Sequence, residues 1–333
     1  MSGVKIIHNK RLSLRYGRAH ILFIISTFVA VSLYVLQRYY QAVLLGGAPL
    51  NIHLSSDKVL LVIILLLVVP KSNIRINKLL IFKILIYSYL LLYFLMKAQG
   101  INRPEVITES NIELMLHICL YIYYSKKINR KDFFALLFLI VLSGSFSVLV
   151  SFFSVIAFLN RKKLKLNHIF LIFIGLVLII MLSIQRGYEG IEDIDRYHYL
   201  LATLNDMREL SDNYGNIWTG MPVFTPVSEA SCLLSPWKRD YVSGYCYSNA
   251  YNLSWARILW DHGLFGILII SFLYYSVLRW KGFESELALG IFFAGALNGV
   301  SVSGIGNTFI LIAVVMLIFF RDSRKHNGFN NNY

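Results

Sequence analysis

The stretch SIQRGYEGIEDIDRYHYLLATLNDMREL at residues 183–210 opens the one long polar segment of this chain, which continues to about residue 252. The segment holds nine of the 18 acidic residues and two of the three cysteines. On both sides the sequence consists of apolar runs separated by short basic clusters. A polar segment between such runs indicates an extramembrane loop between membrane helices.

The composition supports a membrane protein. Hydrophobic residues make up 57% of the 333 residues, and the mean hydropathy is +0.61. A formal charge of +14 would suggest nucleic acid in a soluble protein, but here Lys and Arg lie in short clusters between apolar runs. That arrangement is typical of cytoplasmic loops that face anionic lipid. The sequence therefore predicts one integral membrane domain over residues 1–333, with the lipid bilayer as a partner and no nucleic acid.

Eight apolar runs predict single helices, at about residues 19–37, 55–70, 79–96, 110–125, 168–184, 253–278, 285–301 and 304–320. A ninth run, 133–159, is either one helix or two short crossings that break at Ser143, Gly144 and Ser145. The positive-inside rule favours the hairpin, because a single helix would leave one flanking basic cluster outside. The predicted fold is an all-α polytopic membrane protein with about ten crossings and both termini cytoplasmic. Residues 185–252 then form a large periplasmic loop.

Inside the loop, residues 196–210 predict an amphipathic helix that lies on the membrane surface or over the mouth of the helix bundle. Its apolar side chains on one face are Tyr197, Leu200, Leu201, Leu204 and Met207. Further along, Cys232 and Cys246 are either free thiols or a disulfide. The oxidising compartment and the turn-rich sequence between them favour the disulfide.

Basic residues are the first candidates for chemistry. A guanidinium at Arg196, in the first turn of the predicted helix, would hold a phosphate bidentately or would pair with Asp193 or Asp195. No metal is predicted, because the spacing of the acidic run at residues 189–195 matches no metal-ligand set. The sequence also lacks nucleotide-binding loops, hydrolase elbows and zinc motifs, so no cofactor is expected.

A second group lies in the predicted helix that follows the loop. Arg257, Asp261 and His262 fall in its outer half. Arg257 and Asp261 are four residues apart and would pair on the helix surface. An ionisable cluster at that depth is also a candidate site, since such residues are rare in membrane helices.

Three segments resemble the bacterial O-antigen polymerase and O-antigen ligase superfamily. SGSFSVLVSFFSVIAF at residues 143–158 is similar to the small-residue turn and helix before the family's large loop. DRYHYLLATLNDM at 195–207, followed by NIWTGMP at 216–222, resembles its arginine helix and glycine turn. YSNAYNLSWARILWDHGLFGIL at 247–268 resembles its His-Asn segment and Gly-x-x-Gly helix.

The resemblance assigns roles to several residues. Arg196 corresponds to the family arginine, Gly220 to the glycine of the turn, and Asn249 to the asparagine. Gly263 and Gly266 match the helix glycines. The ligases carry a histidine before the asparagine, and here that position is Ser248. This departure favours a polymerase and leaves the general base unassigned, with His198 and His262 as the replacements in or beside the loop.

The implied activity is a metal-independent glycosyl transfer at the periplasmic face of a bacterial inner membrane. A polyprenyl-diphosphate-linked oligosaccharide chain would move onto a new lipid-linked repeat unit, with a chain-length regulator as a further partner. Besides Arg196, the residues expected to bind these substrates are Arg186, Arg208, Gly220, Ser248, Asn249 and Arg257. Two alternatives are an O-antigen ligase, with lipid A-core as the acceptor, and a polysaccharide transporter or flippase.

Overall fold

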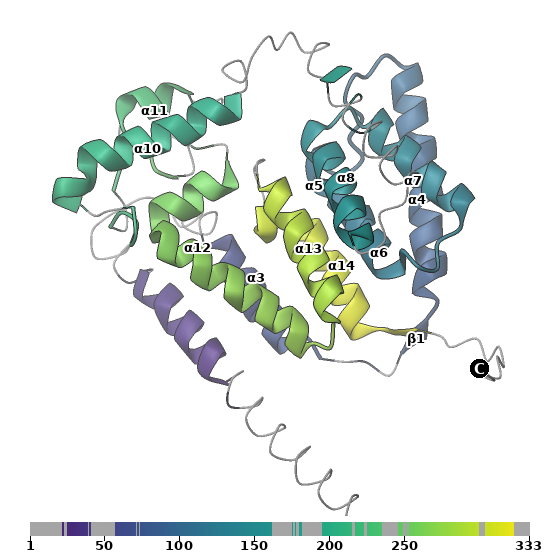
Figure 1. Cartoon of the computed structure of the whole chain (residues 1–333), viewed down its shortest axis with the longest axis horizontal. Coiled ribbons are helices and arrows are strands. Elements are labelled where there is room, and N and C mark those ends of the chain that lie inside the picture. Colours follow the sequence, from purple (N-terminus) through teal and green to yellow (C-terminus); the bar gives the residue numbers. More distant parts are fainter. Residues whose placement is uncertain are drawn as a thin grey trace, which may run out of the picture. The chain divides into compact units, whose positions relative to one another are not determined.

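The computed structural model describes most of the chain. The described residues are 22, 25–38, 40, 57–70, 72, 74–161, 175, 177, 180–181, 195–214, 217–222, 225–234, 246–248, 251, 253–299 and 304–322. They form two compact units (Figure 1). Unit 1 combines residues 1–68 with 194–284, and unit 2 combines residues 69–193 with 285–333.

Unit 1 contains the N-terminal helix Ile25–Arg38 and helices α3 (Lys58–Val68), α10 (Asp195–Tyr214), α11 (Glu229–Leu234) and α12 (Ser254–Trp280). Helix α3 packs against α12, and α10 packs against both α11 and α12. A buried cluster joins these last three, with Tyr199 and Met207 from α10 packed among Tyr251 and Trp260. Segments that are far apart in the sequence therefore share one core.

Unit 2 is built from short helices. They are α4 (Lys78–Ala98), α5 (Ser110–Glu113), α6 (Met115–Tyr124), α7 (Arg130–Leu142), α8 (Phe146–Asn160), α13 (Ser285–Asn298), η4 (Gly304–Gly306) and α14 (Thr308–Phe319). Helix α4 packs on α7, α13 on α8 and α6, and α14 on α6. A two-residue parallel pairing of β1 (Arg75–Ile76) with β2 (Arg321–Asp322) ties the start of the unit to its end.

The predicted break in residues 133–159 is confirmed. Helix α7 ends at Leu142, α8 begins at Phe146, and Gly144 between them has a φ of 61°. Ser143 and Ser145 are buried, and Ser143 Oγ donates to the carbonyl of Ile140 at 2.6 Å. The turn is thus enclosed by protein, as a polar turn between apolar helices requires.

The all-α class is confirmed for the described residues, apart from the short β1–β2 pairing. Two of the described helices, α4 and α12, are long and apolar enough to span a membrane. Most of the others have 10–15 residues, as in α6 and α8, which is shorter than the roughly 20 residues of a full crossing. The number of about ten crossings stays a prediction, as does the periplasmic side of residues 185–252.

Candidate functional site

Helix α12 is broken at Gly263. This residue has a φ of 66° and a ψ of −172° inside an otherwise helical segment, a conformation that essentially only glycine adopts. The break separates a first part, which ends at His262, from a second part that continues to Trp280. Backbone groups around the break lose their partners within the helix and need others.

The segment at residues 217–221 supplies those partners. It crosses the break and makes three backbone hydrogen bonds, which replace the missing helical ones. They are Met221 N to Trp260 O at 2.7 Å, Leu264 N to Ile217 O at 2.9 Å, and Phe265 N to Trp218 O at 3.0 Å. These hydrogen bonds from a second segment of unit 1 therefore stabilise the break.

Close approach of the two backbones requires glycine on both sides. A Cβ on Gly220 would lie 2.7 Å from the amide nitrogens of His262 and Gly263. A Cβ on Gly263 would lie 2.4 Å from Gly220 N and from the Trp218 carbonyl oxygen. The sequence singled out both glycines, and the structure brings them together.

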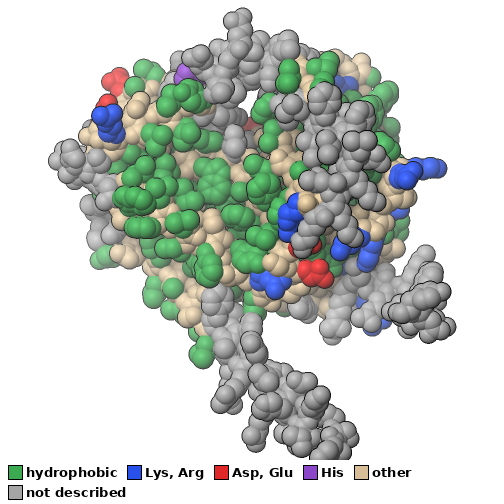
Figure 2. Space-filling view, viewed as in Figure 1, with side chains coloured by type: hydrophobic (Ala, Val, Ile, Leu, Met, Phe, Trp, Pro, Cys, Tyr) green, Lys and Arg blue, Asp and Glu red, His purple; other side chains and the backbone are tan. Residues whose placement is uncertain are grey.

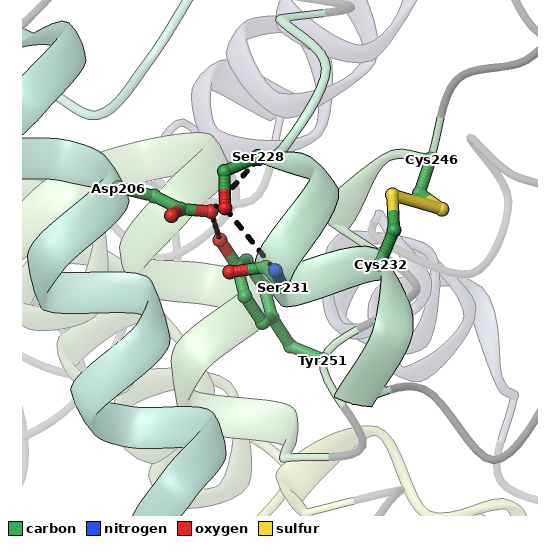
Figure 3. The surroundings of a disulfide bond; sticks show 6 residues. All are labelled: Asp206, Ser228, Ser231, Cys232, Cys246 and Tyr251. Carbon is green, nitrogen blue, oxygen red and sulfur yellow. Dashed lines mark hydrogen bonds between the residues drawn. A yellow bond between two sulfur atoms is a disulfide. The ribbon is translucent and has the colours of Figure 1, made fainter.

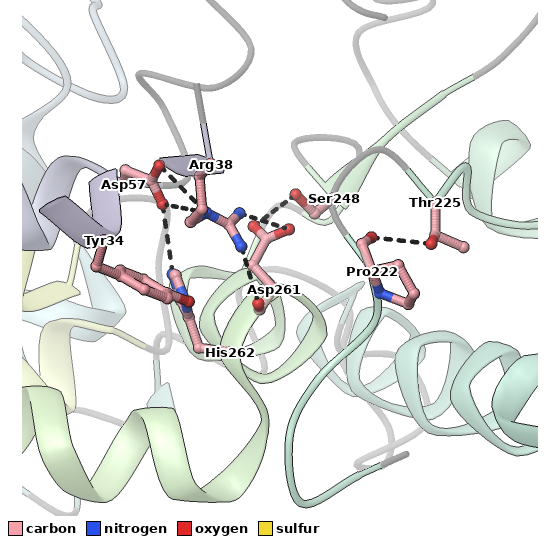
Figure 4. Close-up of polar contacts among 8 residues, drawn as sticks. All are labelled: Tyr34, Arg38, Asp57, Pro222, Thr225, Ser248, Asp261 and His262. Atoms are coloured by element: carbon pink, nitrogen blue, oxygen red, sulfur yellow. Dashed lines mark hydrogen bonds and ion pairs between the residues drawn. The ribbon is translucent and has the colours of Figure 1, made fainter. Parts of the chain in front are cut away.

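A cluster of ionisable side chains lies beside this break (Figure 4). At its centre is Arg38, in the N-terminal helix, which is 7% exposed. Its Nε lies 3.2 Å from Asp57 Oδ1, and its Nη2 lies 3.6 Å from Asp261 Oδ1. Its Nη1 also donates to the Asp261 carbonyl oxygen at 3.2 Å. One buried cation thus holds two carboxylates and a backbone oxygen at the end of the first part of α12.

His262 joins the same cluster from the other side of Asp57. Its Nδ1 lies 2.8 Å from the Tyr34 hydroxyl, and its Nε2 lies 3.5 Å from Asp57 Oδ1. Both facing atoms, His262 Nε2 and Asp57 Oδ1, are buried and lack a hydrogen-bond partner among the described residues. A carboxylate next to an imidazole whose other nitrogen meets a hydroxyl is an arrangement suited to moving a proton.

Ser248 completes the cluster. Its Oγ donates to Asp261 Oδ2 at 2.9 Å, so the segment before α12 is tied to the same carboxylate that Arg38 holds (Figure 4). Asp261 thus connects the N-terminal helix, α12 and the segment that precedes α12.

Two further cations lie close by. Lys58, the first residue of α3, follows Asp57 directly and experiences the positive charge of Arg257 in α12. Arg257 is half-buried, and its Nε donates to the Tyr251 carbonyl oxygen at 2.7 Å. Two like charges near one end of unit 1 form an electropositive position beside the cluster.

The segment from α10 to Tyr251 has a polar core of its own (Figure 3). Buried Asp206 of α10 accepts from the Tyr251 hydroxyl at 2.8 Å and from Ser228 N at 3.0 Å. Burial, followed by the negative charge of Asp206, raises the pKa of Tyr251. Cys232 and Cys246 are joined by a disulfide beside these residues. The disulfide that the sequence favoured over free thiols is the form present.

Some of the site residues predicted from sequence lie at the cluster, and others do not. His262, Ser248, Gly220 and Arg257 lie at or beside the cluster. His198 does not join it. That residue is exposed on α10 and contacts the ring of Tyr197.

Of the other predicted arginines, Arg208 is exposed on α10. Arg196 lies in the first turn of α10, but its side chain is outside the described part, as are Arg186 and Asn249. The expected pairing within α12 is replaced, for Asp261, by contacts with Arg38 and Ser248.

Sequence reasoning missed Tyr34, Arg38 and Asp57. The signal was present, because Asp57 and Arg38 are charged residues within or at the end of apolar runs, which marks a candidate site in a membrane protein. What the sequence could not supply was their proximity to residues more than 200 positions later. No group of three or more His, Cys, Asp or Glu side chains suited to a metal occurs in the part of the chain that the structure describes.

Comparisons of the chain with known proteins found no match. No family model, no curated protein and no solved structure matches the chain.

Proposed function

We propose that the protein is a membrane glycosyltransferase that polymerises polyprenyl-diphosphate-linked oligosaccharide units at the outer face of a bacterial inner membrane. The observation that carries the proposal is the placement of His262 between Asp57 and the Tyr34 hydroxyl, beside a helix break. The resemblance to O-antigen polymerases left this activity without a base. His262 is the residue that fills that role.

In this reaction the acceptor sugar hydroxyl attacks the anomeric carbon of the donor chain. The bond between that carbon and the phosphate oxygen breaks, and the polyprenyl diphosphate leaves with the electron pair. The proton of the hydroxyl passes to His262 Nδ1, directly or through the Tyr34 oxygen that lies 2.8 Å from it. Asp57 stabilises the resulting imidazolium, which is the usual task of a carboxylate next to a catalytic histidine.

The leaving diphosphate needs positive charge. Arg38 is already occupied by two carboxylates, so it organises the cluster and does not serve the substrate. Lys58 and Arg257 are two further cations beside it, and pre-placed cations stabilise developing phosphate charge strongly when water is excluded. Arg196 and Arg186 are further candidates from the sequence.

A transporter is the second candidate, because a broken helix with buried ionisable residues is typical of transport proteins. The position of the cluster favours the enzyme. Asp57 directly precedes α3, and Asp261 is the eighth residue of α12, about 10 Å from the start of that helix. Transport sites lie near the middle of the membrane, whereas this cluster lies near helix ends. A ligase is disfavoured by Ser248 at the position of the ligase histidine.

The test is polymer formation by purified protein in vesicles that contain only the lipid-linked repeat unit. His262→Ala and Asp57→Asn are expected to abolish polymer while the protein still inserts. Polymer that forms only with an ion gradient, or undiminished activity in His262→Ala, would overturn the proposal. A reporter fused at residue 215 tests the side of the membrane, and it is expected to be active only outside the cytoplasm.

A further inference from the structure

Helix α10 has three different faces around its axis. Its inner face is buried in unit 1 and consists of Tyr199, Thr203, Asp206 and Met207. A polar face, with His198, Asn205 and Glu209, is exposed. Between these two faces lies an apolar face of Tyr197, Leu200, Leu201 and Leu204, each 36–39% exposed, with the exposed Arg208 among them. Met207, which the sequence grouped with this apolar face, is buried instead.

We propose that α10 lies in the membrane–water interface, with its apolar face against lipid and its polar face in water. A helix in a fully aqueous setting needs only two kinds of face, one buried and one polar. A third face, apolar and partly exposed, matches a helix that lies in the plane of the interface. The inference rests on membrane residence and is independent of sugar transfer.

The occupant is lipid because the same surface continues onto a helix that is long and apolar enough to span a membrane. The second part of α12 exposes Phe265, Leu268, Ile269 and Phe272, each more than half exposed. Hydrophobic side chains gather over α10 and α12 in the same view (Figure 2).

An aromatic side chain marks the boundary of that surface. Trp218, 53% exposed, contacts the ring of Phe265 with 5.5 Å between the ring centres. Tryptophan is enriched where hydrocarbon meets the headgroups. The lipid face of α12 therefore ends, at Trp218, on the side where α10 lies. In this arrangement α10 anchors its end of unit 1 to the bilayer surface.

The test uses spin labels on full-length protein in vesicles of phosphatidylethanolamine and phosphatidylglycerol. Single cysteines replace Leu201 or Leu204, and matched controls on the same helix replace Asn205 or Glu209. A Cys119→Ser background removes the one free, buried thiol among the described residues. Collision with oxygen, which partitions into the bilayer, is compared with collision with a water-soluble nickel chelate.

Labels at residues 201 and 204 are expected to collide several-fold more with oxygen than those at 205 and 209, and several-fold less with nickel. Equal, high nickel collision at all four positions would overturn the proposal, since the apolar face would then be in water. Shielding of 201 and 204 from both reagents would also overturn it, because protein would cover that face. Neither result bears on polymer formation, so the two proposals fail separately.

Discussion

The glycine at the helix break provides the sharpest test of the structure. Replacing Gly263 by alanine adds a Cβ that would lie 2.4 Å from both Gly220 N and the Trp218 carbonyl oxygen. No backbone atom can yield there without moving the crossing segment. The φ of 66° with a ψ of −172° is also closed to alanine.

The expected cost has two parts. Forcing alanine into this conformation costs about 1–3 kcal/mol. The crossing segment must also move away from the added Cβ, so the three backbone hydrogen bonds at the break are lost, at about 1 kcal/mol each. With both effects, Gly263→Ala is expected to lower the free energy of unfolding of unit 1 by about 4–6 kcal/mol.

The assay is denaturant unfolding of the purified protein in detergent, followed by tryptophan fluorescence, which reports on unit 1, and by far-UV circular dichroism, which reports on the helices of both units. Trp218 and Trp260 flank the break and report on it directly. Gly100→Ala is the matched control, because Gly100 also has a positive φ, of 84°, but no atom lies within 4 Å of an added Cβ. That variant should lose only about 1–2 kcal/mol. Equal stability of the two variants would refute the close crossing of Gly220 and Gly263.

Three further predictions concern charge, pH and the disulfide. Arg38→Met leaves Asp57 and a second carboxylate buried without a counter-charge and should cost about 3–5 kcal/mol. Adding Asp57→Asn should restore much of that loss in thermal unfolding, and no restoration would contradict the pairing. Tyr251 is neutral in the fold with a raised pKa, so its contribution is complete below its unfolded pKa of about 10 and declines above it. Tyr251→Phe should therefore lose less stability between pH 10 and 11.5 than the wild type in a pH titration of unfolding. Cys232→Ser should leave one thiol that can be alkylated, and it should lower the free energy of unfolding by about 3 kcal/mol. An unchanged unfolding midpoint would show that the disulfide does not stabilise the fold.

The helices were largely predictable from the sequence because their signal is local. The apolar run at 253–278 corresponds to α12 (Ser254–Trp280), and 79–96 corresponds to α4 (Lys78–Ala98). The hairpin break at residues 143–145 followed from charge on its two flanks. Burial on α10 was less predictable, because side chains that share an apolar face can meet either a protein core or lipid. Met207 is buried, whereas Leu201 on the same predicted face is exposed.

The candidate site could be predicted only in part. His262 and Gly263 stand in one recognisable segment, so sequence pattern was enough to single them out. Arg38 comes from the N-terminal helix and Asp57 from the position just before α3, and they meet Asp261 and His262 only through packing. No spacing rule connects residues separated by 223 positions. Charge in an apolar run was the one local signal they offered.

The most direct test of the proposed function asks whether polymer formation requires His262. Purified wild-type protein and His262→Gln are placed in vesicles with the lipid-linked repeat unit, and polymer is counted over a range of pH. Wild-type protein should form polymer, and His262→Gln, inserted in the same amount, should form none at any pH in the range. Polymer formation by His262→Gln at the wild-type rate and with the same pH profile would contradict the account.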